Sequence, residues 1–325
     1  MFLNIFFIIA GLVILVAGAE GLVRGAASIA ASLKIPALVI GLTVVSFGTS
    51  APELTVNLLA AFSGSTDLAV GNVIGSNIGN ILLILGICAL IVPLEVKSST
   101  VWKEIPLALL GVVLVLIMGN DQFFDGVGYN ALTRTDGIAL LALMIIFMYY
   151  VFGLAKADRA GIQATGNGEG EIKMFSLPVA SGLTIVGLIA LVLGGRLLVS
   201  GATDIAKAAG LSESLIGLTI VAIGTSLPEL ATSIVAALKK QADIAIGNVV
   251  GSNIFNVFFV LGTTSTITAL PITSALTIDI GVSVAASLLL FLCMFIGRQH
   301  RLVRWQGALF LVLYALYLIY LIDRG

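Results

Sequence analysis

The feature that most constrains this chain is a 47-residue segment that occurs twice. Residues 40–86 align without a gap to residues 216–262 at a constant offset of 176, and 25 of the 47 positions are identical. The identities concentrate on Gly, Pro, Glu, Asn, Ser and Thr, although both copies lie in strongly apolar sequence. Segments that only had to contact lipid would not require these residues. The repeat therefore indicates two related halves that build a polar site.

The rest of the composition sets the class of protein. The chain is 59% hydrophobic and 10% charged, with a mean hydropathy of +1.16. A soluble protein of 325 residues could not bury so much apolar surface, so we expect an all-α polytopic membrane protein surrounded by lipid. The short alternating segments of a β-barrel are absent. No basic stripe interleaved with aromatic residues predicts nucleic-acid binding, and nothing indicates an obligatory protein partner.

Apolar runs predict ten membrane spans in two groups of five. The first five-helix repeat occupies residues 1–153 and the second occupies 174–325, with a polar, Gly-rich cytoplasmic linker at 154–173. The expected spans are 2–32, 36–62, 67–92, 101–118, 135–153, 175–209, 212–238, 243–268, 277–297 and 302–322. The first and sixth exceed the 20 or so residues that cross a bilayer core, so both should be strongly tilted.

An odd number of spans per repeat implies that the second repeat enters the membrane inverted. With the N-terminus outside, the inner loops carry eleven Lys and Arg residues and the outer loops only three, Arg134, Lys207 and Arg324. This bias is typical of cytoplasmic loops and predicts that both termini lie outside the plasma membrane. Inverted repeats with interrupted helices are typical of secondary transporters whose binding site lies at the bilayer midplane.

The first shared motif places a carboxylate inside each repeat. It reads GTSAPE at 48–53 and GTSLPE at 224–229. Each proline lacks an N–H and should break its span, which would leave carbonyl oxygens near 46–49 and 222–225 without helical partners. A charge near the bilayer centre costs about 2.5–3.5 kcal/mol on insertion scales. No embedded Lys or His lies near Glu53 or Glu229, so metal ions are the expected counter-charge.

The second shared motif adds neutral oxygens. It reads GNVIGSNIGN at 71–80 and GNVVGSNIFN at 247–256. We expect its glycines to allow close helix contact and Asn72 and Asn248 to hydrogen-bond the backbone between helices. We expect the serine and the last asparagine of each copy to act as cation ligands. Ligands that are all oxygen select hard cations, and a flexible mixture of carboxylates, hydroxyls and carbonyls suits Ca²⁺.

Together these motifs resemble the paired repeats of the cation/calcium exchanger superfamily, and within it the prokaryotic sodium/calcium exchangers. The resemblance covers nearly the whole chain. It implies that Ca²⁺ binds to Glu53, Glu229, Thr49 and Thr225, and that Asn80 and Asn256 complete the centre. It also implies flanking Na⁺ sites made by Ser46, Ser50, Ser76, Ala222, Ser226 and Ser252, with Ser46 and Ala222 acting through their backbone carbonyls.

The expected function is therefore a secondary antiporter that exchanges Na⁺ for Ca²⁺ by alternating access. It would be a transporter rather than an enzyme and would hold no prosthetic group. Asparagine at both 80 and 256 argues against K⁺ co-transport, because potassium-dependent relatives carry Asp at the second position. Proton/calcium exchange is the main alternative, a cation channel is a second, and an intramembrane hydrolase a third, although no hydrolytic constellation of residues is present.

Overall fold

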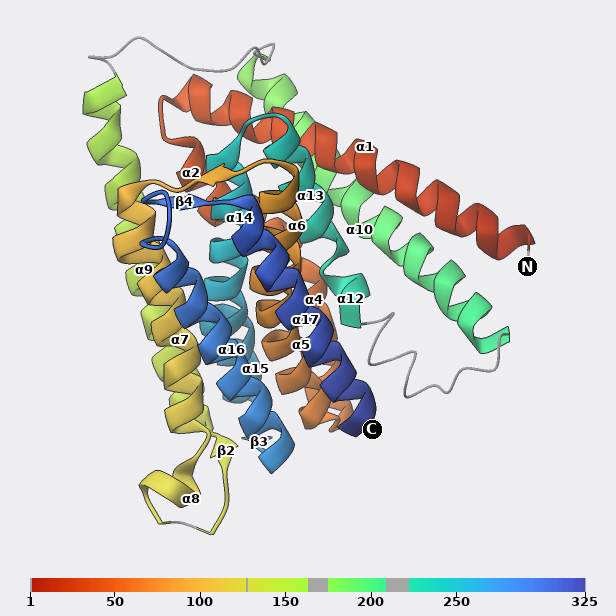
Figure 1. The fold of residues 1–325 in the computed structure, drawn as a ribbon, viewed down its shortest axis with the longest axis vertical. Helices are drawn as coiled ribbons and strands as arrows, with labels where there is room; N and C mark the ends of the chain where they lie inside the picture. The colour runs from red at the N-terminus through yellow and green to blue at the C-terminus, as the bar shows by residue number, and fades with distance from the viewer. Residues whose placement is uncertain (1, 127, 163–174, 209–221, 325) are drawn as a thin grey trace.

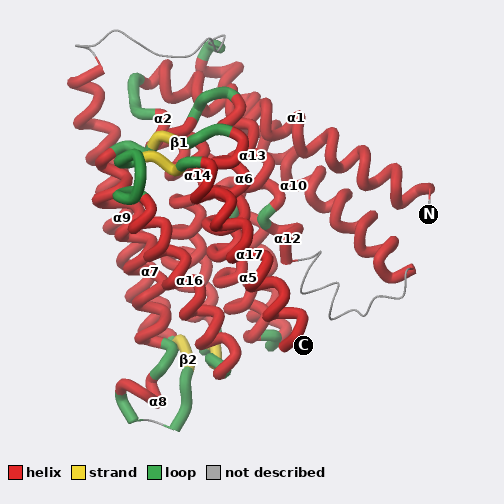
Figure 2. The backbone as a smooth tube through the Cα atoms, in the orientation of Figure 1, coloured by secondary structure: helices red, strands yellow, loops and turns green. Residues whose placement is uncertain are grey.

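The computed structural model describes residues 2–126, 128–162, 175–208 and 222–324, and these are helical apart from loops and four two-residue strands (Figure 2). Eight of the described helices are long and apolar enough to cross a membrane. A bent pair, Ala37–Thr49 with Ala51–Ser63, makes a ninth span if it is counted as one. The seventh expected span, 212–238, is described only from residue 222 onward. The all-α, polytopic class is confirmed.

The two halves contain similar series of elements, in which η marks a π-helical segment (Figure 1). The first half comprises α1 (Phe2–Leu33), α2 (Ala37–Ile40), η1 (Gly41–Val45), α3 (Ser46–Thr49), α4 (Ala51–Ser63), α5 (Thr66–Ile78), η2 (Gly79–Leu85), α6 (Gly86–Ile91), β1 (Leu94–Glu95), η3 (Thr100–Glu104), α7 (Ile105–Met118), α8 (Asp121–Phe124), β2 (Ala131–Leu132) and α9 (Arg134–Ile162). The second comprises α10 (Leu177–Ala208), α12 (Ala222–Thr225), α13 (Leu227–Leu238), α14 (Ala242–Ile254), η5 (Phe255–Leu261), α15 (Gly262–Ile267), β3 (Leu270–Pro271), α16 (Ser274–Cys293), β4 (Arg301–Leu302) and α17 (Arg304–Arg324).

Helix α9 is longer than the sequence predicts. It continues to Ile162, so the first nine residues of the predicted linker, 154–162, are helical. This stretch contains three Ala together with one Leu, one Lys and one Arg, all of which favour helix, and it contains no proline to end it. The remainder of the predicted linker lies outside the described residues.

Helices α1 and α10 form an oblique antiparallel pair on one side of the bundle (Figure 1). Glycines recur at intervals of seven residues along both helices, at 11, 18 and 25 and at 187, 194 and 201. A Cβ added to Gly187 would lie 2.6 Å from the backbone nitrogen of Leu22, and one on Gly18 would lie 2.8 Å from that of Leu191. The two backbones are therefore in contact along much of their length, as small residues allow between membrane helices.

The centre of the bundle is formed by the two spans that carry the second motif. Within the span Ala242–Ile267, 94% of an apolar 18-residue stretch is buried, and within Thr66–Ile91 72% is buried, whereas the corresponding share in no other described span exceeds 44%. A Cβ on Gly247 would lie 3.1 Å from the Cα of Gly41, which confirms that this glycine allows close helix contact. Gly251 likewise faces Leu42 and Ser46. The repeat counterparts of Gly41 and Leu42, residues 217 and 218, lie outside the described residues.

Two short antiparallel sheets join the halves at opposite ends of the bundle (Figure 2). In one, β1 pairs with β4, so that Leu94 lies opposite Leu302 and Glu95 opposite Arg301. In the other, β2 pairs with β3, and Leu132 lies opposite Leu270. Leu270 is the repeat counterpart of Leu94 at the offset of 176. Each half therefore contributes one strand to each sheet.

Candidate ion-binding site

Both glutamates follow a break in their span, as the prolines predict. At Ser50 the helix is interrupted (φ −81°, ψ 4°) and α4 begins with Pro52 in its first turn. The second copy is interrupted at Ser226 (φ −89°, ψ 5°), with Pro228 in the first turn of α13. In the first copy the two parts are bent by 42°. A proline is tolerated at this position because the first N–H groups of a helix have no intrahelical acceptor.

The carbonyl of Ser46 differs from the prediction, because it has hydrogen-bond partners. It accepts the backbone N–H of Ser50 at 2.9 Å and the hydroxyl of Thr49 at 3.3 Å. Pro52 removes only the N–H that would reach Gly48, so the helix is intact one turn earlier. The Ser46 hydroxyl oxygen lies 2.5 Å from the carbonyl oxygen of Gly41 and 3.1 Å from that of Gly247, so it joins the two halves.

The second copy of this break has a different backbone pattern. The N–H of Ser226 donates to the carbonyl of Ile223 at 3.1 Å, three residues back, whereas Ser50 donates four residues back. Ala222 is the first residue of α12. Of the two backbone carbonyls expected to bind an ion, the one at Ser46 thus keeps its helical partner. A carbonyl oxygen has a second lone pair, so this bond does not prevent cation binding.

The two glutamates are completely buried and each receives a hydroxyl from the opposite half of the chain. Ser226 donates to Glu53 Oε1 at 3.5 Å, and Ser50 donates to Glu229 Oε1 at 3.2 Å. Ser76, from the same half, donates to Glu53 Oε1 at 3.4 Å. The structure therefore brings both carboxyls into one site.

Besides Ser252 Oγ, four buried oxygens at this site have no hydrogen-bond partner among the described residues. They are Glu53 Oε2, Glu229 Oε2, Asn80 Oδ1 and Asn256 Oδ1, two pairs related by the repeat. A buried acceptor without a partner costs about 1–3 kcal/mol. Carboxylate and amide oxygens are ligands of hard cations, which would satisfy all four at once. These oxygens are buried and form pairs related by the repeat, so they make this centre the candidate cation site.

The amides of Asn80 and Asn256 are oriented by a second pair of asparagines. Asn80 Nδ2 donates to Asn253 Oδ1 at 2.9 Å. Asn256 Nδ2 donates to Asn77 Oδ1 at 3.1 Å. Asn77 and Asn253 also donate to each other's backbone carbonyls, at 3.3 and 3.4 Å. Because each Nδ2 is held in this way, each Oδ1 of Asn80 and Asn256 is left without a partner.

From the sequence, Asn77 and Asn253 are expected only to lie in spans that add neutral oxygens, and neither is named as a ligand or as a positioning residue. Both asparagines are identical in the two copies and lie in the same motif as the expected ligands, so the sequence does contain a signal that marks them. It was not specific enough, because an asparagine in such a motif can be a ligand or a hydrogen-bond partner. Only their contacts across the two halves distinguish these roles.

Asn72 and Asn248 hydrogen-bond the backbone, as predicted. Asn248 Nδ2 donates to the carbonyl of Glu229 at 3.2 Å, and Asn72 Nδ2 to that of Glu53 at 3.5 Å. Their side-chain oxygens accept the hydroxyls of Thr49 (3.0 Å) and Thr225 (3.4 Å) from the opposite half. Two residues that the sequence reasoning missed complete this network. They are Asn57, 2.8 Å from Asn72, and its repeat counterpart Ser233, 2.9 Å from Asn248.

The other expected ligands are distributed around the same centre. Thr49, Ser50, Ser76 and Ser252 are buried, while Thr225 and Ser226 are partly buried. Ser226 Oγ lies 3.3 Å from Ser76 Oγ, so hydroxyls of the two halves meet. Within the described ranges no cluster of three or more His, Cys, Asp and Glu residues occurs. The candidate site thus combines two carboxyls with neutral oxygens.

Comparisons with known proteins point to one family. A family model described as sodium/calcium exchanger protein matches residues 3–153 and 179–322. The chain is 40% identical to a putative antiporter, CaxA, of Alkalimonas amylolytica over 94% of each chain. It is 41% identical to the inner membrane protein YrbG of Escherichia coli over 80% of this chain and 79% of that protein. A solved structure of the sodium-calcium exchanger NCX_Mj, soaked with Na⁺ and Sr²⁺, matches with a TM-score of 0.82 and 34% identity over 97% of each chain.

Proposed function

Because this chain belongs to the sodium/calcium exchanger family, a family of membrane transporters, we propose that it is an antiporter in which Na⁺ influx drives Ca²⁺ extrusion. The ions would be bound in turn at the site that contains Glu53 and Glu229. Ca²⁺ and Na⁺ are then substrates rather than cofactors.

The observation that carries this proposal is the set of four unpartnered oxygens between the halves. Two ionised glutamates carry about −2, which one Ca²⁺ or two monovalent cations would neutralise. Thr49, Thr225, Asn80 and Asn256 would supply neutral oxygens to Ca²⁺. Competition of both ions for the same carboxylates links inward movement of one to outward movement of the other.

Additional Na⁺ sites would use the hydroxyls of Ser50, Ser76, Ser226 and Ser252 and the backbone carbonyls of Ser46 and Ala222. Ser50 and Ser226 each reach the glutamate of the opposite half. An ion bound at either serine would therefore lie next to residues of both halves. The carbonyl of Ser46 would bind an ion while it keeps its helical hydrogen bond.

The architecture we propose is ten spans in two inverted five-helix repeats, 1–153 and 174–325. Reciprocal contacts support it, because several hydrogen bonds that one half donates to the other are also received from it at the constant offset of 176. The mutual hydrogen bonds of Asn77 and Asn253 and the two sheets at opposite ends of the bundle follow this rule. Such contacts arise when two similar units are related by a two-fold axis. The span that completes the ten would be the expected 212–238, of which α12 and α13 are described.

Alternating access would come from movement of α1 and α10 against the central helices. Both are long and oblique, and their backbones are in direct contact through glycines, so they are suited to move as one unit. The site lies on the central spans, which are the most buried in the described chain. If α1 and α10 move while the ion site stays fixed, Glu53 and Glu229 would be exposed to each side of the membrane in turn.

The proposed location is the plasma membrane, with both termini outside. The eleven-to-three distribution of basic residues supports this orientation. The ends of α9 and α10 that adjoin the linker lie at the end of the bundle opposite to the C-terminus (Figure 1). The relative YrbG is an inner membrane protein by name, which agrees with this location.

The test is ⁴⁵Ca²⁺ uptake into proteoliposomes with Na⁺, H⁺ and K⁺ gradients applied separately. An outward Na⁺ gradient should drive uptake, whereas a K⁺ gradient should not. Uptake that responds only to the pH gradient would instead establish proton/calcium exchange. Uptake that does not saturate and needs no counter-ion would indicate a channel.

Glu53→Gln and Glu229→Gln should each abolish Ca²⁺ binding and uptake. Glu104→Gln is the matched control, because Glu104 is also fully buried in a span but bonds Tyr150 at a distance from the site. Normal Ca²⁺ affinity in either site variant would show that the site assignment is wrong.

A further inference from the structure

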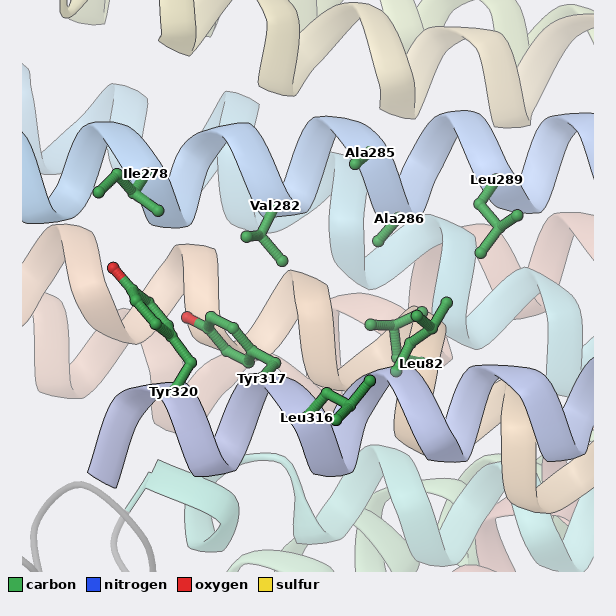
Figure 3. A pocket seen from close by; sticks show the side chains of 10 residues that line it. Leu82, Ile278, Val282, Ala285, Ala286, Leu289, Leu316, Tyr317 and Tyr320 are labelled. Atoms are coloured by element: carbon green, nitrogen blue, oxygen red, sulfur yellow. The ribbon is translucent and has the colours of Figure 1, made fainter. Parts of the chain in front are cut away.

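A separate apolar groove runs between α16 and α17 (Figure 3). Its volume is about 380 Å³, and its walls include Ile278, Val282 and Leu289 of α16 and Leu316 and Tyr320 of α17, with Leu82 of η2 between them. Ile278 and Leu316 are more than half exposed. Both helices are membrane spans by length and composition, so the groove opens toward the lipid.

The dimensions of the groove favour a single hydrocarbon chain as its occupant. From Ile278 to Leu289 it extends eleven residues, roughly 16 Å along the helix axis, which is about half of a bilayer core. A helix of another protein, about 10 Å across and of the same length, would fill on the order of 1,200 Å³. The volume of 380 Å³ is too small for it. Water is excluded as a filling because the lining is almost entirely apolar.

One end of the groove carries a cation. Tyr320 lies at this end, and the guanidinium of Arg324 sits 5.3 Å above its ring. Arg324 donates through Nη1 and Nη2 to the two carboxylate oxygens of the buried Asp279, each at 3.0 Å. Nη1 also donates to the carbonyl of Ala275 at 3.3 Å and to the hydroxyl of Tyr320 at 3.5 Å, so Nε and the second N–H of Nη2 are the donors left over. The side chain of Arg324 is nevertheless 30% exposed, and a guanidinium has five N–H donors in all. Donors therefore remain for an acceptor that approaches from the membrane surface.

A phosphate is the acceptor that this position would meet. Arg324 is the last residue of α17, and α16 begins close by at Ser274, so this end of the groove lies at the membrane interface. Tyrosine and arginine are enriched at that level of the bilayer. Arginine binds phosphate through two parallel N–H donors.

We propose that this groove is a specific phospholipid site, with one acyl chain between α16 and α17 and the phosphodiester on Arg324. The chain would contact Leu82, two residues from Asn80 on the same π-helical segment. A bound lipid would therefore lie directly against the segment that holds one of the unpartnered oxygens of the ion site. The proposed lipid site does not depend on the proposed exchange activity.

The test is native mass spectrometry of the purified protein with added palmitoyl-oleoyl-phosphatidylglycerol, at a detergent concentration that removes weakly held lipid. We expect one lipid to remain on the wild type. Val282→Trp and Leu316→Trp fill the groove and should each lower the bound fraction at least tenfold. Leu288→Trp and Ile319→Trp, on exposed faces of the same helices that do not line the groove, should retain the lipid. Equal lipid retention in all four variants would mean that the lipid is only annular and would overturn the proposal.

The phosphate contact is tested by a double variant, Asp279→Asn with Arg324→Gln, which removes both charges of the ion pair together. It should lower the bound fraction at least tenfold while circular dichroism remains that of the wild type. Unchanged binding would refute the role of Arg324. A stable dimer of the wild type that Val282→Trp abolishes would show that a second copy of the chain occupies the groove, which would also overturn the lipid assignment.

Discussion

Asn77 offers the sharpest test of how the site is held together, because it acts through other residues. Its Nδ2 donates to the carbonyl of Asn253 at 3.3 Å, and its Oδ1 accepts Nδ2 of Asn256 at 3.1 Å. Asn77→Ala removes both bonds inside a completely buried cluster. The stranded amide of Asn256 costs about 1–3 kcal/mol and the lost bond to Asn253 about 1 kcal/mol. We expect the variant to be less stable by about 2–4 kcal/mol.

The same change should weaken Ca²⁺ binding, although Asn77 is not an expected ligand. Without its acceptor, the amide of Asn256 is free to rotate, and its Oδ1 no longer points reliably at the site. Loss of a residue that orients a metal ligand typically lowers affinity 10–100-fold. Calorimetric titration with Ca²⁺ and thermal melting in detergent measure the two effects. Ser287→Ala is the control, since it removes a buried hydroxyl that bonds only the carbonyl of Ser283 within α16.

A double-mutant cycle separates positioning from general damage. If Asn77 acts through Asn256, then Asn77→Ala should have little further effect on Ca²⁺ affinity in an Asn256→Ala background. The coupling free energy should be about 1–3 kcal/mol. Additive losses of affinity, or an Asn77→Ala variant that binds Ca²⁺ normally, would refute the argument that this pair orients the ligand.

Three further predictions follow from contacts outside the site. Gly187→Leu should force α1 and α10 apart, because even a Cβ at this position would lie 2.6 Å from the backbone nitrogen of Leu22. We expect a loss of about 1–3 kcal/mol in the free energy of unfolding, measured by thermal melting. Gly182→Leu is the control and should melt like the wild type, because the space around Gly182 is open. Arg324→Gln should destabilise the protein by about 3 kcal/mol, because it leaves the buried carboxylate of Asp279 without its cation. Adding Asp279→Asn to this variant should restore most of the lost stability. Failure of this rescue would contradict the pairing. Lys239→Gln removes a 2.6 Å ion pair with the partly exposed Glu20 and should lower the free energy of unfolding by less than about 1 kcal/mol. This difference between variant and wild type should disappear in 0.5 M salt. A larger loss of stability that persists in salt would exclude a surface ion pair as its cause.

Much of this protein follows from local sequence. The apolar runs determine where helices cross the membrane, because a backbone in lipid must satisfy its own hydrogen bonds. Pro52 and Pro228 determine where two of them break, because a missing N–H acts within one turn. The exact recurrence of the motifs then marks Glu53 and Glu229 as partners, since nothing in an ordinary apolar helix would preserve a carboxylate twice at one spacing.

What the sequence could not determine depends on contacts between residues 173–202 positions apart. The hydroxyl of Ser46 bonds Gly247, and the amides of Asn80 and Asn256 are oriented from the opposite half by Asn253 and Asn77. An asparagine has the same chemistry whether it binds an ion or holds a neighbour that does. The direction of its amide decides between the two, and that direction is set by the facing helix. The tertiary structure alone therefore decided which of these oxygens have a hydrogen-bond partner within the protein and which have none.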